Sequence, residues 1–176
     1  MGKALIADTA VKLQGKLHQL SSGHVIINDT KDGDEYLILS NFKVDYIRET
    51  FLRKYKKIAI FYRYQSELEQ LQTLPGTTTD SHLFESLNQS IFLGQFKKDR
   101  EGVKLSTADI IIFYTLDFAY LSYEQGKARI NHKDRQKECI LHLLFSSEGM
   151  ESDIYKALKK KKGYDVRMFK RDLQRR

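Results

Sequence analysis

Four short runs of apolar residues constrain the fold of this chain more than any other feature of the sequence. Each run is too continuous to alternate between a buried and a solvent-facing side, and each is too short for an ordinary helix. Such runs predict strands that are buried on both faces, which is typical of parallel sheets covered by helices. The runs are Ile58–Tyr62, Ser90–Leu93, Asp109–Tyr114 and Ile140–Phe145.

The segments beside these runs have the length and the apolar spacing of helices. Apolar residues recur at intervals of three and four in residues 43–55, 65–74, 119–130 and 151–160. Strands that alternate with helices of this length specify right-handed βαβ units. The predicted fold class is therefore α/β, with three αβα layers around a mainly parallel central sheet.

The first part of the chain shows a different pattern. Apolar spacing predicts a helix over residues 3–20, and a polar turn between 24–27 and 36–39 predicts a small hairpin. We therefore expect three regions: an N-terminal helix and hairpin over 1–42, an α/β lobe over 43–160, and a basic C-terminal tail over 161–176. The length of 176 residues, 41% of them hydrophobic, suits one such domain with its own core.

The basic charge of the chain is concentrated at its end. The net charge is +7, and residues 156–176 hold ten Lys or Arg against Asp165 and Asp172. Such a segment could follow the phosphates of a nucleic acid and release their counterions. It could equally be a solvated C-terminal helix, and charge alone does not separate the two alternatives.

Several classes of protein are disfavoured by what the sequence lacks. No segment approaches the roughly 20 apolar residues that cross a bilayer, so we expect no membrane association and a cytoplasmic location. Cys139 is the single cysteine, adjoins an apolar run and is expected to be a buried strand residue. The five histidines and this cysteine show no metal-ligand spacing, so no metal site is predicted. No Gly-Lys pair has the glycine-rich turn of a P-loop, so we expect no ATP hydrolysis by this chain alone.

Three loops follow predicted strands, in the position where open α/β sheets bind ligands. The first begins after Tyr62 and leads to the sequence Glu67–Leu71. The second runs from Arg100 to Asp109, and its Gly102 could let the backbone turn close to a phosphate. The third comprises Ser122–Arg135 and carries several basic residues on a predicted helix.

In this order the loops resemble motifs IV, V and VI of the second RecA-like lobe of superfamily 2, SNF2-like DNA helicases and translocases, in their compact phage form. Ser40–Lys43 is similar to the S-x-K sequence at the start of that lobe, and Glu151–Lys156 to its closing helix. The first 20 residues resemble the segment that links the two lobes. The resemblance covers nearly the whole chain and implies a RecA-like fold.

The resemblance also implies roles for individual residues in ATP binding. Gly102, Gln125 and Arg129 would contact the nucleotide. Motif VI places a second arginine three residues after Arg129, but this chain has His132 there. The resemblance then favours Arg135 as the arginine finger, with Arg129 in that role or weakened hydrolysis as the alternatives. ATP and Mg²⁺ would bind only together with a first lobe that carries the P-loop, in cis or in trans.

The nucleic-acid contacts that the resemblance implies lie in the first two loops. The residues expected to hold the strand backbone are Tyr62, Arg63, Lys97, Lys98, Ser106 and Thr107. DNA is the expected partner, with RNA as an alternative, and the setting would be a bacterial or phage-infected cell. A second hypothesis is a non-catalytic RecA-like module that binds DNA or docks onto a partner helicase. The aromatic residues near motif VI are expected to pack in the core or between lobes rather than stack on bases.

Overall fold

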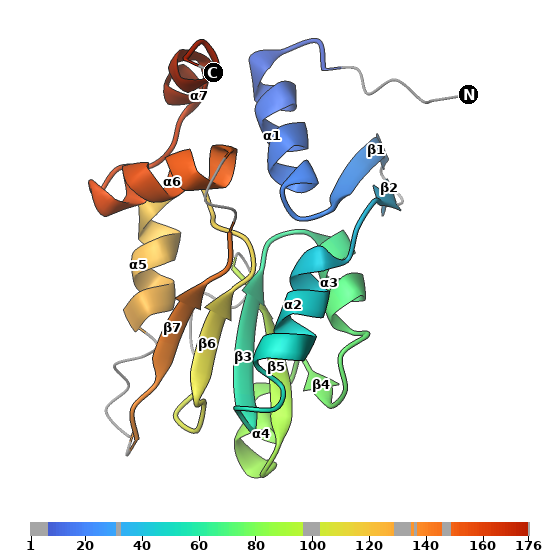
Figure 1. Ribbon diagram of the computed structural model, residues 1–176, viewed down its shortest axis with the longest axis vertical. Coiled ribbons are helices and arrows are strands. Elements are labelled where there is room, and N and C mark those ends of the chain that lie inside the picture. Colours follow the sequence, from blue (N-terminus) through green and yellow to red (C-terminus); the bar gives the residue numbers. More distant parts are fainter. Residues whose placement is uncertain are drawn as a thin grey trace.

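Five parallel strands form the central sheet of the computed structural model, which describes residues 7–30, 33–96, 103–128, 135, 137–145 and 149–175. β3 (Lys57–Tyr62) lies in the middle (Figure 1). β5 (Ser90–Gln95) and the short β4 (Thr77–Thr78) lie on one side of it. β6 (Ile110–Phe113) and β7 (Ile140–Leu143) lie on the other, and every neighbouring pair is parallel.

Helices cover both faces of this sheet, because alternate strand residues point to opposite sides. In β3, Ile58 and Ile60 pack with α2 (Phe42–Thr50) and α3 (Gln65–Leu71) in one buried cluster. Phe61 points the other way, toward α4 (Ser81–Ser86) and α5 (Tyr120–Ala128). These three layers confirm the predicted α/β class and its mainly parallel sheet.

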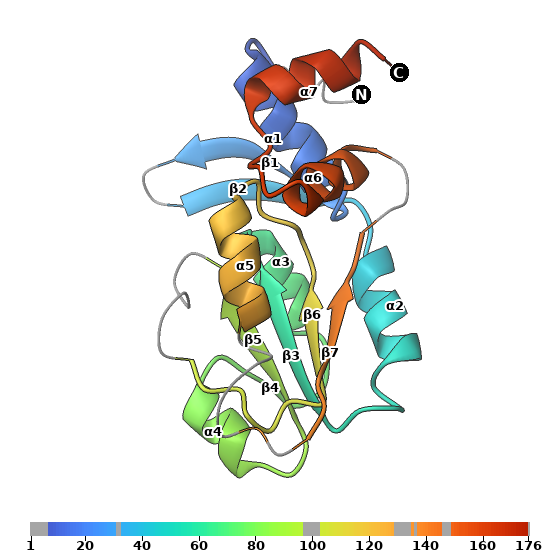
Figure 2. The ribbon, with the colours of Figure 1, turned by 90° about the vertical axis from the view of Figure 1, so that its left-hand side faces the viewer.

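The remaining elements gather beyond the carboxyl ends of the strands (Figures 1 and 2). They are α1 (Ala10–Leu20), the antiparallel hairpin of β1 (His24–Thr30) and β2 (Gly33–Ile38), α6 (Met150–Lys159) and α7 (Val166–Leu173). The segment expected to be a basic tail thus contains a helix. Tyr164 and Phe169 anchor it, since each has only 3% of its surface exposed. Residues 161–175 therefore belong to the folded unit.

Several other expectations are corrected by the structure. Residues 77–89, for which the apolar pattern predicted neither a helix nor a strand, contain β4 and α4. β7 is an edge strand, and 49% of Ile140 is exposed, so burial on both faces was wrong for this strand. Cys139 precedes β7 and is only half-buried. Helix α1 begins at Ala10, where the Thr9 hydroxyl accepts a hydrogen bond from the Lys12 amide at 3.2 Å, and residues 1–6 lie outside the described residues.

The described ranges contain neither a membrane-spanning helix nor a cluster of metal ligands. None of their helices is long and apolar enough to cross a membrane. None of their His, Cys, Asp and Glu side chains form a group of three or more that could hold a metal ion.

Candidate functional site

The chain crosses from one side of the sheet to the other next to β3, which makes the carboxyl ends of β3 and β6 a topological switch point. β4 and β5 add to one side of β3, whereas β6 and β7 add to the other. Open α/β sheets bind ligands in the crevice at such a point. The residues that leave the two strands here are Arg63 and Tyr64 after β3 and Tyr114–Asp117 after β6.

Glu67 joins the two strand ends. This fully buried carboxylate accepts hydrogen bonds from the amides of Arg63 at 2.8 Å and Tyr64 at 3.0 Å. Its other oxygen accepts from the hydroxyl of Thr115. A glutamate at the third position of a helix that bonds back to the preceding amides is the carboxylate half of a capping box. Here the same side chain also fixes the segment that follows β6.

A second buried group ties the outer helices to the same strand end. The Lys43 ammonium forms an ion pair with Glu151 at 2.8 Å, and the two side chains are 2% and 0% exposed. Lys43 also donates to the Tyr114 carbonyl at 2.9 Å and to the Ser22 hydroxyl at 3.3 Å. The two sequence features that flank the motifs, around Lys43 and around Glu151, therefore meet in space although they are far apart in the chain.

Two buried histidines hold α1 and the hairpin against this network. His18 Nδ1 lies 2.8 Å from the Tyr64 hydroxyl, and the His24 ring lies edge-on to Tyr64 with ring centres 5.0 Å apart. Burial, followed by the charges of Arg63 and Lys43, holds the pKa of His18 well below its usual value. Burial also lowers the pKa of His24, and it raises the pKa of Tyr64 to about 12. All three groups are therefore neutral at pH 7.

The switch point is consequently filled by the chain itself. The Ser22 and Thr115 hydroxyls lie 2.9 Å apart inside it, so the turn after α1 occupies the crevice. A ligand of this lobe must bind at the rim, where α5 and the loops emerge.

The first loop exposes less side-chain surface to a nucleic acid than the sequence suggested. Tyr62 is 5% exposed and packs in the core on the α2 side of the sheet. Arg63 forms an ion pair with Asp117, and its guanidinium lies 4.8 Å from the centre of the Phe118 ring. The side chain of Arg63 keeps 18% of its surface exposed. Of these two residues, only Arg63 has surface available at the rim.

Helix α5 carries Gln125 and packs tightly against the sheet at Gly126. A Cβ added to Gly126 would lie 2.3 Å from Cζ of Phe113, so only glycine allows this approach. The Gln125 amide oxygen is buried, and no described group donates a hydrogen bond to it. Tyr123 packs edge-on against Phe113, with ring centres 6.2 Å apart. Phe113 and Tyr114 are fully buried, which confirms a packing role for these two aromatic residues.

The second loop ends at the opposite edge of the sheet. Residues 103–109 lead into the amino end of β6, where Asp109 donates its amide to the Lys57 carbonyl at 2.8 Å. The hydroxyls of Ser106 and Thr107 donate to Glu85 at 2.6 and 3.0 Å. The expectation that this whole loop lies at the carboxyl ends of the strands was wrong for its second half. Ser106 and Thr107 are not brought together with Arg63 or Gln125.

Arg135 lies at this same amino-terminal edge. Its guanidinium donates to the carbonyls of Leu105 and Ala108, each at 2.7 Å. These hydrogen bonds stabilise the turn before β6, so the side chain of Arg135 has a structural role. The other predicted site residues, Gly102, Arg129, Lys97 and Lys98, lie outside the described residues, as does His132.

The sequence analysis missed Glu67, Thr115 and Asp117 as members of the polar network. One local signal was present for Glu67, which stands three residues into a helix after a strand. Thr115 and Asp117 directly follow a buried strand, which is the position where polar residues of parallel sheets reach the ligand edge. The partner of Lys43 had no such signal, because Glu151 is 108 residues away.

Comparison with known proteins supports the fold. No family model matches the chain, and no curated protein matches its sequence. Among solved structures, it is similar to one described as the C-terminal part of the Fun30 ATPase domain, with a TM-score of 0.56 and 18% sequence identity. The match covers 65% of this chain and 44% of that structure, so the chain spans less than half of its length. Similarity at this identity establishes a shared α/β architecture.

Proposed function

We propose that this chain is the second motor lobe of an ATP-dependent DNA helicase or translocase. One combination of observations carries the proposal: a parallel-sheet lobe similar to part of an ATPase domain, with Gln125 on a helix that a glycine holds tightly to the sheet. In such motors ATP lies between two lobes, and their closing and opening moves the nucleic acid. The lobe would complete an ATP site that a first lobe begins.

Among the residues that the structure describes, Gln125 is the one that suits contact with a nucleotide. Gln125 is partly exposed, and its amide oxygen accepts no hydrogen bond from a described group, so we propose that the amide turns toward a bound nucleotide. ATP, bound with Mg²⁺, would supply the phosphoanhydride bond whose hydrolysis drives the motor. We propose that Gly102 and Arg129 contact the same nucleotide.

We propose Arg129 as the arginine finger in preference to Arg135. A finger needs a free planar guanidinium that can reach the charge that builds up on the transferred phosphoryl group. Two carbonyls already engage the guanidinium of Arg135, at the edge of the sheet away from the carboxyl ends. In the sequence, Arg129 is the residue after the end of α5 and stands four positions after Gln125.

For the nucleic-acid strand we propose Arg63 together with Lys97 and Lys98, which stand just beyond β5 in the sequence. The ion pair with Asp117 orients Arg63 toward the rim without consuming all its donors. Tyr62 supports this loop from the core. Ser106 and Thr107 stay predictions, and a strand that reaches them would have to cross to the amino-terminal edge.

The test is steady-state ATP hydrolysis, with DNA present, by the motor assembled from this chain and a first lobe that carries a P-loop. Changing Arg129→Ala should lower kcat by about 10³-fold or more, the usual effect of losing a finger. Arg135→Ala should lower the melting temperature and leave the kcat of the folded protein largely intact. Unchanged kcat in Arg129→Ala and Gln125→Ala would refute the proposed ATP site.

A further inference from the structure

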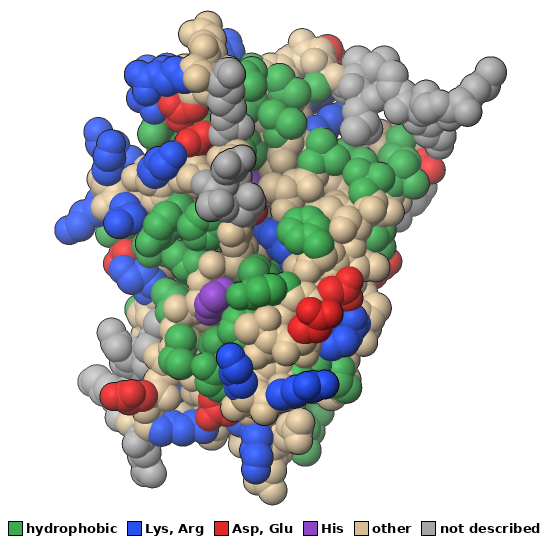
Figure 3. Space-filling view, in the orientation of Figure 1, with side chains coloured by type: hydrophobic (Ala, Val, Ile, Leu, Met, Phe, Trp, Pro, Cys, Tyr) green, Lys and Arg blue, Asp and Glu red, His purple; other side chains and the backbone are tan. Residues whose placement is uncertain are grey.

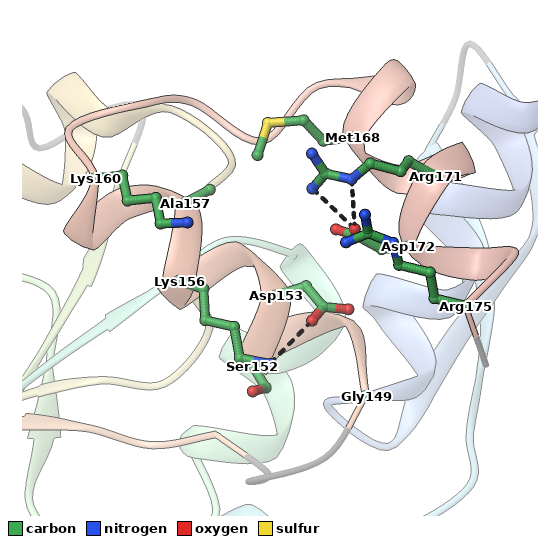
Figure 4. A pocket seen from close by; sticks show the side chains of 10 residues that line it. All are labelled: Gly149, Ser152, Asp153, Lys156, Ala157, Lys160, Met168, Arg171, Asp172 and Arg175. Carbon is green, nitrogen blue, oxygen red and sulfur yellow. Dashed lines mark hydrogen bonds and ion pairs between the residues drawn. The ribbon is translucent and has the colours of Figure 1, made fainter.

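Lys and Arg side chains gather on the surface over α6 and α7 (Figure 3). A cleft of about 530 Å³ lies between these two helices, and none of its described lining residues comes from α5 or from the three loops (Figure 4). Phe169 of α7 is buried in the core, whereas charged residues of the same segment line the cleft. Lys156 and Lys160 line the cleft from the side of α6. Arg171 and Arg175 line it from the side of α7.

The charges in the cleft are unequal. Four cationic side chains line it against two carboxylates, those of Asp153 and Asp172. Asp172 pairs with Arg171 at 2.9 Å, and Asp153 lies 3.4 Å from Lys156. Lys160 and Arg175 have no ion-pair partner in the described part of the chain. Two cations on opposite walls therefore remain available to an anion.

The lining also indicates which kind of anion fits. Arg and Lys donors suit phosphate oxygens, and arginine can bind two of them at once. No aromatic residue of the described ranges lines the cleft, so these ranges offer a base or a free nucleotide nothing to stack on. The apolar side chains among the described lining residues are those of Ala157 and Met168. Such a surface suits the repeated phosphates of a strand and has no means to read its bases.

We propose that the cleft between α6 and α7 binds the phosphodiester backbone of a nucleic acid, independently of base sequence. This inference rests on the proposed function, because it gives the motor a second contact to its substrate. Binding in the cleft differs from a general attraction between DNA and a basic tail. The contact is assigned to cations on the two opposite walls of a folded cleft. Nearby cations outside the cleft, such as Lys162 and Arg167, would contribute far less.

The experiment compares two variants that lose the same charges. Lys160→Ala with Arg175→Ala removes the two available cations of the cleft. Lys162→Ala with Arg167→Ala removes one lysine and one arginine from exposed positions outside it. Binding of the whole chain to a fluorescent single-stranded DNA of mixed sequence is measured by anisotropy at several salt concentrations, and thermal melting checks that both variants fold.

The cleft pair should weaken binding about tenfold or more at low salt and reduce the slope of log affinity against log salt by about 1.4, the value for two phosphate contacts on a single strand. The control pair should weaken binding less than about threefold. Equal losses in the two pairs would overturn the proposal in favour of diffuse attraction. Competition by polyglutamate as strong as that by polyphosphate would overturn it in favour of an acidic peptide.

A variant that removes a negative charge from the cleft distinguishes a loss of DNA affinity caused by charge from one caused by damage to the fold. Asp153→Asn removes a negative charge from the cleft wall and should tighten binding a few-fold, which a destabilised protein would not do. Unchanged or weaker binding by this variant counts against the cleft. ATP hydrolysis is measured separately, so failure of the motor proposal with intact cleft binding, or the reverse, would be recognised.

Discussion

Gly126 shows how a single residue positions the candidate ATP-facing helix. A Cβ there would meet the fully buried ring of Phe113 at 2.3 Å, so Gly126→Ala must push α5 away from the sheet. Overpacking of this kind costs about 1–3 kcal/mol, which outweighs the gain of up to about 1 kcal/mol from replacing a helical glycine. We expect a lower free energy of unfolding in urea titrations.

Gly15 is the matched control for this prediction. It also lies inside a helix, but a Cβ there would have no atom within 4 Å. Gly15→Ala should therefore stabilise the protein by about 0.5–1 kcal/mol. Equal effects of the two substitutions would contradict the close packing of α5.

His18 and His24 predict how stability depends on pH. The folded protein lowers the pKa of both rings, so they bind protons more readily in the unfolded chain, whose histidines titrate near 6.5. Their contribution is fully present above pH 6.5 and is lost as the pH falls below it, by up to about 1.4 kcal/mol per pH unit for each ring. Unfolding at pH 7.5 and 5.5 should show this loss.

Replacing His18→Gln removes one titrating ring and keeps a polar partner for Tyr64. The variant should lose less stability than the parent between pH 7.5 and 5.5. The carboxylates whose pKa is lowered, such as Glu85 and Asp109, titrate below this window and do not obscure the result. An identical pH profile in the variant would show that His18 is not a buried neutral group.

The loop before β6 shows why the positions of individual loop residues could not be predicted from the sequence. Gly102, Ser106 and Thr107 stand close together in the sequence, which suggested one site. Because β6 runs parallel to β5, the connection must return to the amino end of the sheet, and Ser106 and Thr107 have already reached it. The sequence does not show where in the connection the chain makes that crossing.

Among the elements, the buried strands were the most predictable. β3, β5 and β6 are continuous apolar runs, and burial on both faces requires such runs. β4 has two residues and α4 has six, which is too short for a periodic pattern to emerge. α7 was hidden by its charge, although Phe169 within it and Tyr164 just before it are buried.

The attachment of α6 to the rest of the lobe depends on Lys43 and Glu151. Each charge is buried and compensated by the other, so Lys43→Met alone or Glu151→Leu alone leaves one buried charge without its partner. Each single change should lower the free energy of unfolding by about 3–5 kcal/mol.

The double variant, Lys43→Met with Glu151→Leu, should be less destabilised than the sum of the singles. Replacing a whole buried pair with apolar groups is often close to neutral. Denaturant unfolding of the variants, analysed as a double-mutant cycle, measures the coupling. Additive losses would mean that the ion pair does not hold the two elements together.

For the molecule as a whole, the fold was predictable and the site only in part. The order of strands and helices follows from the apolar pattern, and the similarity to an ATPase-domain structure agrees with it. The partners in the polar network depend on contacts between distant segments, which one sequence does not reveal. The motor proposal assigns the P-loop, which these 176 residues do not contain, to a first lobe whose ATP site the motif residues would complete.

The most direct test of this account is DNA-stimulated ATP hydrolysis, measured for this chain alone, for a first lobe alone and for the two combined. The account predicts turnover only in the combination, because the phosphate-binding turn and the residues on α5 come from different lobes. Robust hydrolysis by this chain alone, or a combination that is no more active than the first lobe, would contradict it.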